Sequence, residues 1–487
     1  MGNLTIWLTP AWILSLGVIA AAIVMLLVWG LTWLVSRRAA AAMLRLERES
    51  ILQWVSYLVL AFVAFGILAT PIMPVKQVAS SLQRLPLVGK FSTVVTIPAR
   101  TDDKEIQLGF ESDELQSYSF AADEDLVINT ERGKAYSSPL VLVEGNETYA
   151  WTPSSKTPRM FTGPVTALYV TNQSDAPTDL TINYATDVPL HEVRQIPVTA
   201  ATILAIYLVY GLLHWLLPGV STIALATSKE ATAQPIYLLA LMLGACLLVL
   251  FIYIPYNTFG EDVKMYKDSS LMTIMVLAIL VAVWTASVSV ADEIEGRTAL
   301  TLLSKPISRR EFVIGKFLGI VWANFLMFVL LGAWMLLLVS YKVVYDARET
   351  SNPEPSWQLC NTEMIGIVPG LVLSFMETVV LTAISVAIST RLPMLPNLAI
   401  CGSIYVLGHL GPLIAQSSVG QNEFVAFFGQ LIALILPVLD HFNVQAAVAG
   451  GVRVPPDYLA WAALYCILYS AVAMLFALIL FEDRDLA

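Results

Sequence analysis

Long apolar segments recur along the whole chain, and they constrain its fold more than any other feature. Of its 487 residues, 57% are hydrophobic and 13% are charged, whereas a soluble domain carries about 25% charged residues. A helix needs roughly 20 apolar residues to cross a bilayer, where its backbone groups must pair within the helix itself. The sequence therefore predicts a polytopic α-helical membrane protein.

About nine membrane-spanning helices are expected. The first two belong to an N-terminal part, residues 1–75, the third to residues 196–220, and six more to a core, residues 221–487. The nine segments are 10–35, 51–72, 198–217, 235–256, 271–290, 312–341, 363–390, 397–415 and 458–481.

A further apolar segment, 424–439, is shorter than a crossing requires and contains Pro437. Its length favours a re-entrant or interfacial helix, although a crossing here would move the C-terminus to the other side of the membrane. The arginines after the first span, Arg37, Arg38, Arg45 and Arg48, mark the cytoplasmic side. We therefore expect an N-terminus outside, a C-terminus in the cytoplasm and a location in a bacterial inner membrane.

Residues 76–195 differ from the rest in composition. They hold ten Lys or Arg and sixteen Asp or Glu, and short β-branched runs such as STVVTIPA, LVINT, PLVLVE, TALYVTNQ and DLTINYAT alternate with turn signals. Several short strands at this spacing predict a β-sandwich-like domain, inserted on the extracytoplasmic side. The domain is expected either to bind a partner or to cap the translocation path.

A charged segment at 291–316 separates two apolar spans on the expected cytoplasmic side. It begins with acidic residues, and residues 298–304 have the length of about two helical turns, with Leu300 and Leu303 on one face. Ser308 and Glu311 have the spacing of a capping box, which predicts a new helix beginning there. Such a segment is a natural docking surface for a soluble partner.

The run EIEGRTALTLLSKPISRREFVIGKF, residues 293–317, resembles the cytoplasmic coupling segment of ABC-2 type transporter permeases. A looser resemblance covers about 221–487, and 218–235 resembles the elbow helix that precedes the core. The resemblance implies a permease subunit, homo- or heterodimeric, that docks onto a separate cytoplasmic ATP-binding subunit, with export as the expected direction. The implied docking residues are Glu293, Glu295, Arg297, Leu300, Leu302, Leu303, Lys305, Arg309 and Arg310.

Catalytic motifs are missing from the sequence. The phosphate-binding pattern G-x-x-x-x-G-K-[ST] does not occur, so ATP and Mg²⁺ are expected on the partner subunit, with no cofactor on this chain and no enzymatic activity of its own. The four cysteines have no metal-ligand spacing, and no metal site is expected. A net charge of −10 argues against nucleic-acid binding.

Glu377 is the charge that lies well inside an expected span, where ionisation in lipid is costly. It is a candidate for the substrate path, with Asn324 on a neighbouring span as its candidate hydrogen-bond partner; a neutral, structural carboxyl is the alternative. Two other functions stay open: an ATP-independent channel or secondary transporter, and a membrane-anchored surface-binding module. Related permeases move drugs, lipids, polysaccharides or peptides, so the resemblance implies no single substrate.

Overall fold

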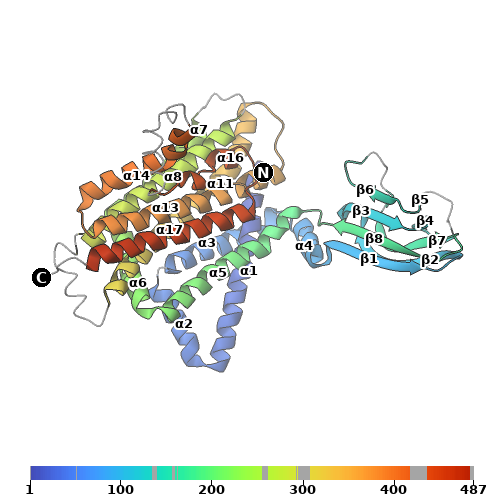
Figure 1. The fold of residues 1–487 in the computed structure, drawn as a ribbon, viewed down its shortest axis with the longest axis horizontal. Helices are drawn as coiled ribbons and strands as arrows, with labels where there is room; N and C mark the ends of the chain where they lie inside the picture. The colour runs from blue at the N-terminus through green and yellow to red at the C-terminus, as the bar shows by residue number, and fades with distance from the viewer. Residues whose placement is uncertain are drawn as a thin grey trace. The chain divides into compact units, whose positions relative to one another are not determined.

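The computed structural model describes residues 2–50, 52–133, 140–155, 160–161, 163–254, 261–291, 293, 308–416 and 436–482. The chain divides into two compact units (Figure 1). The membrane unit combines Met1–Met73 with Ile196–Ala487, and the β unit is Pro74–Gln195.

The membrane unit is helical. Its helices are α1 (Gly2–Val35), α2 (Arg37–Glu49), α3 (Leu52–Ala69), α5 (Gln195–Leu216), α6 (Pro218–Ala233), α7 (Pro235–Tyr253), α8 (Asp262–Ala286), α11 (Arg309–Glu349), α12 (Trp357–Ile365), α13 (Val368–Ser389), α14 (Met394–Gln416), α16 (Gln445–Ala449) and α17 (Pro456–Glu482). Parts of α8, α11, α13, α14 and α17 share one buried apolar core.

Eight helical segments in the described part of the chain are long and apolar enough to cross a membrane. They coincide with eight of the nine expected spans, which confirms a polytopic helical membrane protein. The ninth, 397–415, falls within α14, whose apolar part Met394–Leu410 is shorter. A count of nine therefore stays a prediction. Residues 424–435, most of the expected re-entrant segment 424–439, lie outside the described residues.

Two expected loops are largely helical, and each contains a buried lysine that is paired within the protein. The expected loop 342–361 is mostly the end of α11 and the start of α12, and Lys342 in α11 is fully buried and donates to the Ile252 carbonyl at 3.1 Å. Residues 261–268 likewise form the beginning of α8, where the buried Lys267 pairs with Glu363. The helices therefore extend beyond the expected spans, and the point at which each leaves the membrane stays a prediction.

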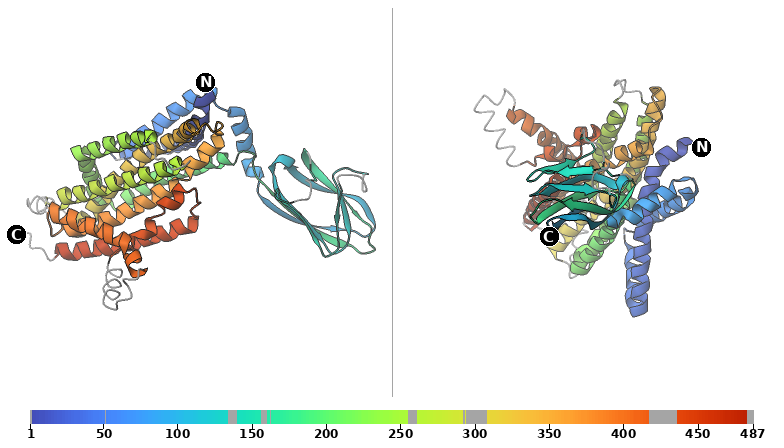
Figure 2. Two further views of the ribbon diagram at one scale, coloured as in Figure 1. Left: turned by 90° about the horizontal axis from the view of Figure 1, so that it is seen from above. Right: turned by 90° about the vertical axis from the view of Figure 1, so that its right-hand side faces the viewer.

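The β unit contains two four-stranded sheets with antiparallel pairing, seen as two layers in Figure 2. Their orders are β1-β8-β3-β6 and β2-β7-β4-β5. The strands are β1 (Lys90–Ile97), β2 (Thr101–Glu111), β3 (Leu115–Ala122), β4 (Leu126–Asn129), β5 (Leu140–Val143), β6 (Thr148–Trp151), β7 (Pro164–Asn172) and β8 (Thr178–Thr186). Side chains of both sheets fill one core, as in a sandwich.

All five β-branched runs singled out in the sequence form strands, namely β1, β4, β5, β7 and β8. Strands β2, β3 and β6 were not expected. In β2, charged residues and two register shifts hide the alternation, although Ile106 and Phe110 are buried. The side of the membrane on which this unit lies stays a prediction.

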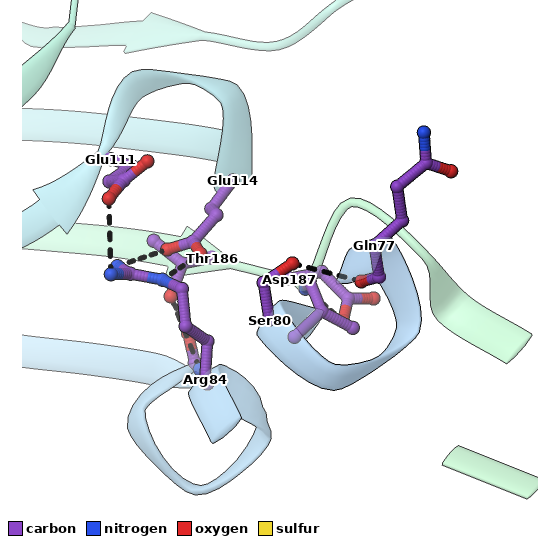
Figure 3. A network of polar contacts seen from close by, with 9 residues as sticks. Gln77, Ser80, Arg84, Glu111, Glu114, Thr186 and Asp187 are labelled. Atoms are coloured by element: carbon purple, nitrogen blue, oxygen red, sulfur yellow. Dashed lines mark hydrogen bonds and ion pairs between the residues drawn. The ribbon is translucent and has the colours of Figure 1, made fainter. Parts of the chain in front are cut away.

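An ion pair between Arg84 and two glutamates connects the helix α4 (Val75–Arg84) to the sandwich (Figure 3). The Arg84 guanidinium donates from Nη2 to Glu114 Oε2 at 2.8 Å and lies 3.2 Å from Glu111 Oε1. Glu114 is 2% exposed. Its hydrogen bond raises the pKa of Arg84 above the ordinary value. The pair fixes the end of α4 against the sheets of its own unit.

Candidate functional site

The expected docking segment is described only at its two ends. Glu293, Arg309 and Arg310 belong to the described residues, whereas the other expected docking residues lie outside them. Those are Glu295, Arg297, Leu300, Leu302, Leu303 and Lys305. The site is therefore built from the groups that hold the ends of the segment.

A buried lysine holds the first end. Lys316, on α11, is 3% exposed, and its Nζ lies 2.6 Å from Glu293 Oε1. Glu230 of α6 approaches the same Nζ at 3.7 Å. Since a buried cation requires paired charge, Lys316 joins the beginning of the docking segment to two helices.

A capping box holds the other end, as the sequence predicted. The Ser308 hydroxyl accepts from the Glu311 amide at 3.2 Å, and the Glu311 carboxylate accepts from the Ser308 amide at 2.8 Å. Arg309 donates to the Glu482 carbonyl at the end of α17, at 3.0 Å. Arg310 is exposed in the same turn. Both described ends of the segment thus contact α11, by a side chain at one end and by the helix start at the other.

The helix α6, expected as an elbow, packs closely along the first part of α11. The contact depends on glycines: a Cβ on Gly319 would lie 2.6 Å from the Ala224 carbonyl oxygen and from Thr227 Cβ. A Cβ on Gly315 would lie at a similar distance from Ile223 Cβ. Small residues allow two membrane helices to approach each other this closely. The helices α6 and α11 therefore form a rigid pair at the docking segment.

A buried polar cluster lies just before the docking segment. Asn397 of α14 places its Nδ2 2.9 Å from the hydroxyls of Ser287, Ser385 and Ser389. All four residues are fully buried. Ser287 begins η5 (Ser287–Ala291), a π-helical turn that continues α8 toward Glu293, and such turns are frequent at functional sites. The cluster links this turn to α13 and α14.

Glu377 of α13 is 1% exposed, and its Oε1 lies 3.5 Å from His409 Nε2 on α14. His409 Nδ1 is 3.0 Å from the Tyr405 carbonyl, so it carries the proton of this hydrogen bond. Asn324 is buried with no hydrogen-bond partner for its side chain among the described residues. The expected hydrogen bond from Asn324 to Glu377 is therefore not formed.

Comparison with known families decides the class of this bundle. The family described as ABC-2 family transporter protein matches residues 99–486, which include the docking segment, the Asn397 cluster and Glu377. The chain belongs to this family. A comparison with curated proteins gave no match.

Membership makes the chain the permease component of an ABC transporter, an integral membrane protein that is not itself catalytic. It also implies partnership with an ATP-binding subunit. The helices α1, α2 and α3 precede the matched residues. They lie outside the part of the permease that the match covers.

Sequence reasoning missed the groups of this permease that depend on contacts between distant segments. Lys316 and Asn397 are examples, because each partner set comes from several helices. A third group, Asp262, Asp346 and Glu349, brings carboxylate oxygens within 4.8 Å of one another. Only Ser308 and Glu311 had a local sequence signal, the spacing of the capping box.

Proposed function

We propose that this permease exports a substrate across a bacterial inner membrane, driven by a separate ATP-binding subunit that docks at residues 293–310. The observation that carries the proposal is the way both described ends of this segment are held. Glu293 is paired with the buried Lys316, and Ser308 caps α11. A connection without a function would not require a buried ion pair at one end and a capped helix at the other.

Movement of the docked subunit would reach the membrane helices along two routes. One passes through Ser308 and Lys316 into α11 and the tightly packed α6. The other passes from Glu293 through the π-helical turn into the Asn397 cluster, and so into α13 and α14. In this scheme Leu302 and Leu303 fill a groove of the partner, while the surrounding charges make polar contacts at its rim.

The proposed assembly contains two permease subunits, identical or related, and ATP with Mg²⁺ on the partner subunits. The N-terminus lies outside, the C-terminus and the docking segment lie in the cytoplasm, and the β unit lies outside. The arginines that follow the first span, Arg37, Arg38, Arg45 and Arg48, support this orientation. Glu377 and Asn324 are proposed for the substrate path. Because both are 1% exposed here, they would take part only when α13 separates from its neighbours.

The test is co-purification of the tagged permease from its host in mild detergent. Wild type is compared with Leu302→Asp/Leu303→Asp, and bound proteins are identified by mass spectrometry. We expect an ATP-binding subunit with wild type and its loss from the variant, because buried apolar anchors dominate docking energies.

The matched control is Leu392→Asp/Leu395→Asp, which changes two exposed leucines on the same expected side of the membrane. It should retain the partner at equal expression. Recovery of no ATP-binding subunit with wild type, even after crosslinking, would overturn the proposal. Equal loss of the ATP-binding subunit from both variants would show that the docking site is not at residues 293–310.

A further inference from the structure

Residues 37–49, which the sequence presents as a short basic connection, form the helix α2. Ser36 caps it by accepting from the Ala39 amide at 3.3 Å. The junction of α1 and α2 stands away from the other helices of the membrane unit, and the end of α2 returns to them (Figure 1). This part of the permease lies before the matched family residues.

The helix α1 is longer than one crossing needs. Its 34 residues span about 51 Å, whereas the hydrocarbon core measures about 30 Å. The first half packs in the bundle, with Trp12 and Val18 buried. The second half exposes apolar side chains, ending with Leu34 at 74% and Val35 at 88%. In an integral membrane protein, such a surface is suited to contact with lipid.

The helix α2 is amphipathic, and its polar face is basic. Its sequence RRAAAAMLRLERE contains four arginines and two glutamates, although the whole chain carries a net charge of −10. Arg37, Arg38 and Arg45 are exposed and fall within a sector of about 100° around the helix axis. Ala40, on another side of the helix, is buried.

The junction of α1 and α2 has the chemistry of a membrane–water interface. The Arg37 guanidinium lies 5.2 Å from the centre of the Trp33 ring, and Trp33 is 45% exposed. Tryptophan is enriched at the level of lipid headgroups. Thus lipid-facing apolar residues, an interfacial tryptophan and the arginines follow one another along the chain.

We propose that α2 lies on the membrane surface and binds anionic phospholipid headgroups through Arg37, Arg38 and Arg45. A basic amphipathic helix next to a lipid-facing surface binds through apolar burial together with attraction to anionic lipid. Guanidinium groups suit phosphate because they donate two parallel hydrogen bonds. The proposed occupant is lipid rather than protein, because the basic face continues the exposed apolar surface of α1 and its charge is complementary to anionic headgroups.

The test uses the full permease in phosphatidylcholine nanodiscs that contain a trace of spin-labelled phosphatidylglycerol or spin-labelled phosphatidylcholine. Electron paramagnetic resonance measures the motionally restricted fraction of each lipid. We expect an excess of restricted phosphatidylglycerol for wild type and its loss for Arg37→Gln/Arg38→Gln/Arg45→Gln. The same three positions changed to lysine should keep most of the excess, which also tests folding.

A matched control removes three positive charges elsewhere, as Lys90→Gln/Arg100→Gln/Arg132→Gln on exposed positions of the β unit. It should behave as wild type. The proposal is overturned if wild type shows no excess of phosphatidylglycerol, or if the glutamine variant at α2 keeps it. It is also overturned if that variant keeps the lipid preference but loses the ATP-binding subunit, because α2 would then be a protein-docking helix.

Discussion

The ion pair of Lys316 with Glu293 allows a quantitative test of how the docking segment is held. Lys316→Met keeps an unbranched buried side chain but removes the charge that lies 2.6 Å from Glu293. At that distance, opposite unit charges attract by about 6 kcal/mol with an effective dielectric constant of about 20, and desolvation of both groups offsets part of it. Deleting one partner of a buried pair costs about 3–5 kcal/mol.

The Glu293 side chain is 21% exposed, which places the cost at the lower end, about 3 kcal/mol. This corresponds to a shift of about 100-fold between the held and the released segment. Recovery of the ATP-binding subunit with Lys316→Met should therefore fall at least about tenfold at equal expression. Glu293→Gln should act in the same direction, and the double variant should be no worse than the more affected single variant.

Lys264→Met is the matched control. Lys264 also lies 2.7 Å from a carboxylate, that of Glu261, but both side chains are well exposed. Surface pairs contribute about 0–1 kcal/mol, so recovery should be unchanged. If Lys316→Met retains the partner as wild type does, or if the two single losses add in the double variant, the ion pair does not hold the segment.

Three further changes test other parts of the permease. Gly319→Ile should lower the detergent melting temperature and the yield, with a cost of about 1–3 kcal/mol or more, because its Cβ meets the backbone of α6 at 2.6 Å; Gly402→Ile, with no described atom within 4 Å, should not. Asn397→Leu should leave the docking of the ATP-binding subunit intact but lower permease-stimulated ATP hydrolysis, and an unchanged rate would remove the cluster from the transmission route. Glu114→Gln should increase proteolysis at α4 relative to wild type, since it weakens the contact with Arg84; equal cleavage would show that other contacts fix this helix.

The sequence was sufficient for features that depend on neighbouring residues. The apolar spans follow from the cost of unpaired backbone in lipid, and the capping box at Ser308 is read within four residues. The five predicted strands had clear β-branched runs. By contrast, α11 continues past its expected end, where Lys342 donates a hydrogen bond to the Ile252 carbonyl on α7. This partner is distant in the sequence and cannot be predicted from neighbouring residues.

The same limit applies to the candidate site. The close approach of α6 to α11 requires that the glycines of α11 face α6. The sequence shows where the glycines are but not which helix they face. The partner of Glu377 proved to be His409 rather than Asn324, because α14 and not α11 brings a polar side chain to that carboxyl. Physical chemistry predicts that a buried carboxyl has a polar neighbour, whereas the packing of the helices decides which side chain that is.

The positions of the polar contacts suggest which helices move together. The helices α6 and α11 have close glycine contacts and are expected to move as one body, and Lys316 of α11 pairs with Glu293. The helices α13 and α14, in contrast, are joined by polar contacts at two levels, the Asn397 cluster and the pair of Glu377 with His409. Hydrogen bonds between side chains can be exchanged for others at little cost in free energy, whereas a glycine contact cannot open without leaving a void. A conformational change that starts at the docking segment is therefore expected to separate α14 from α13 before it separates α6 from α11.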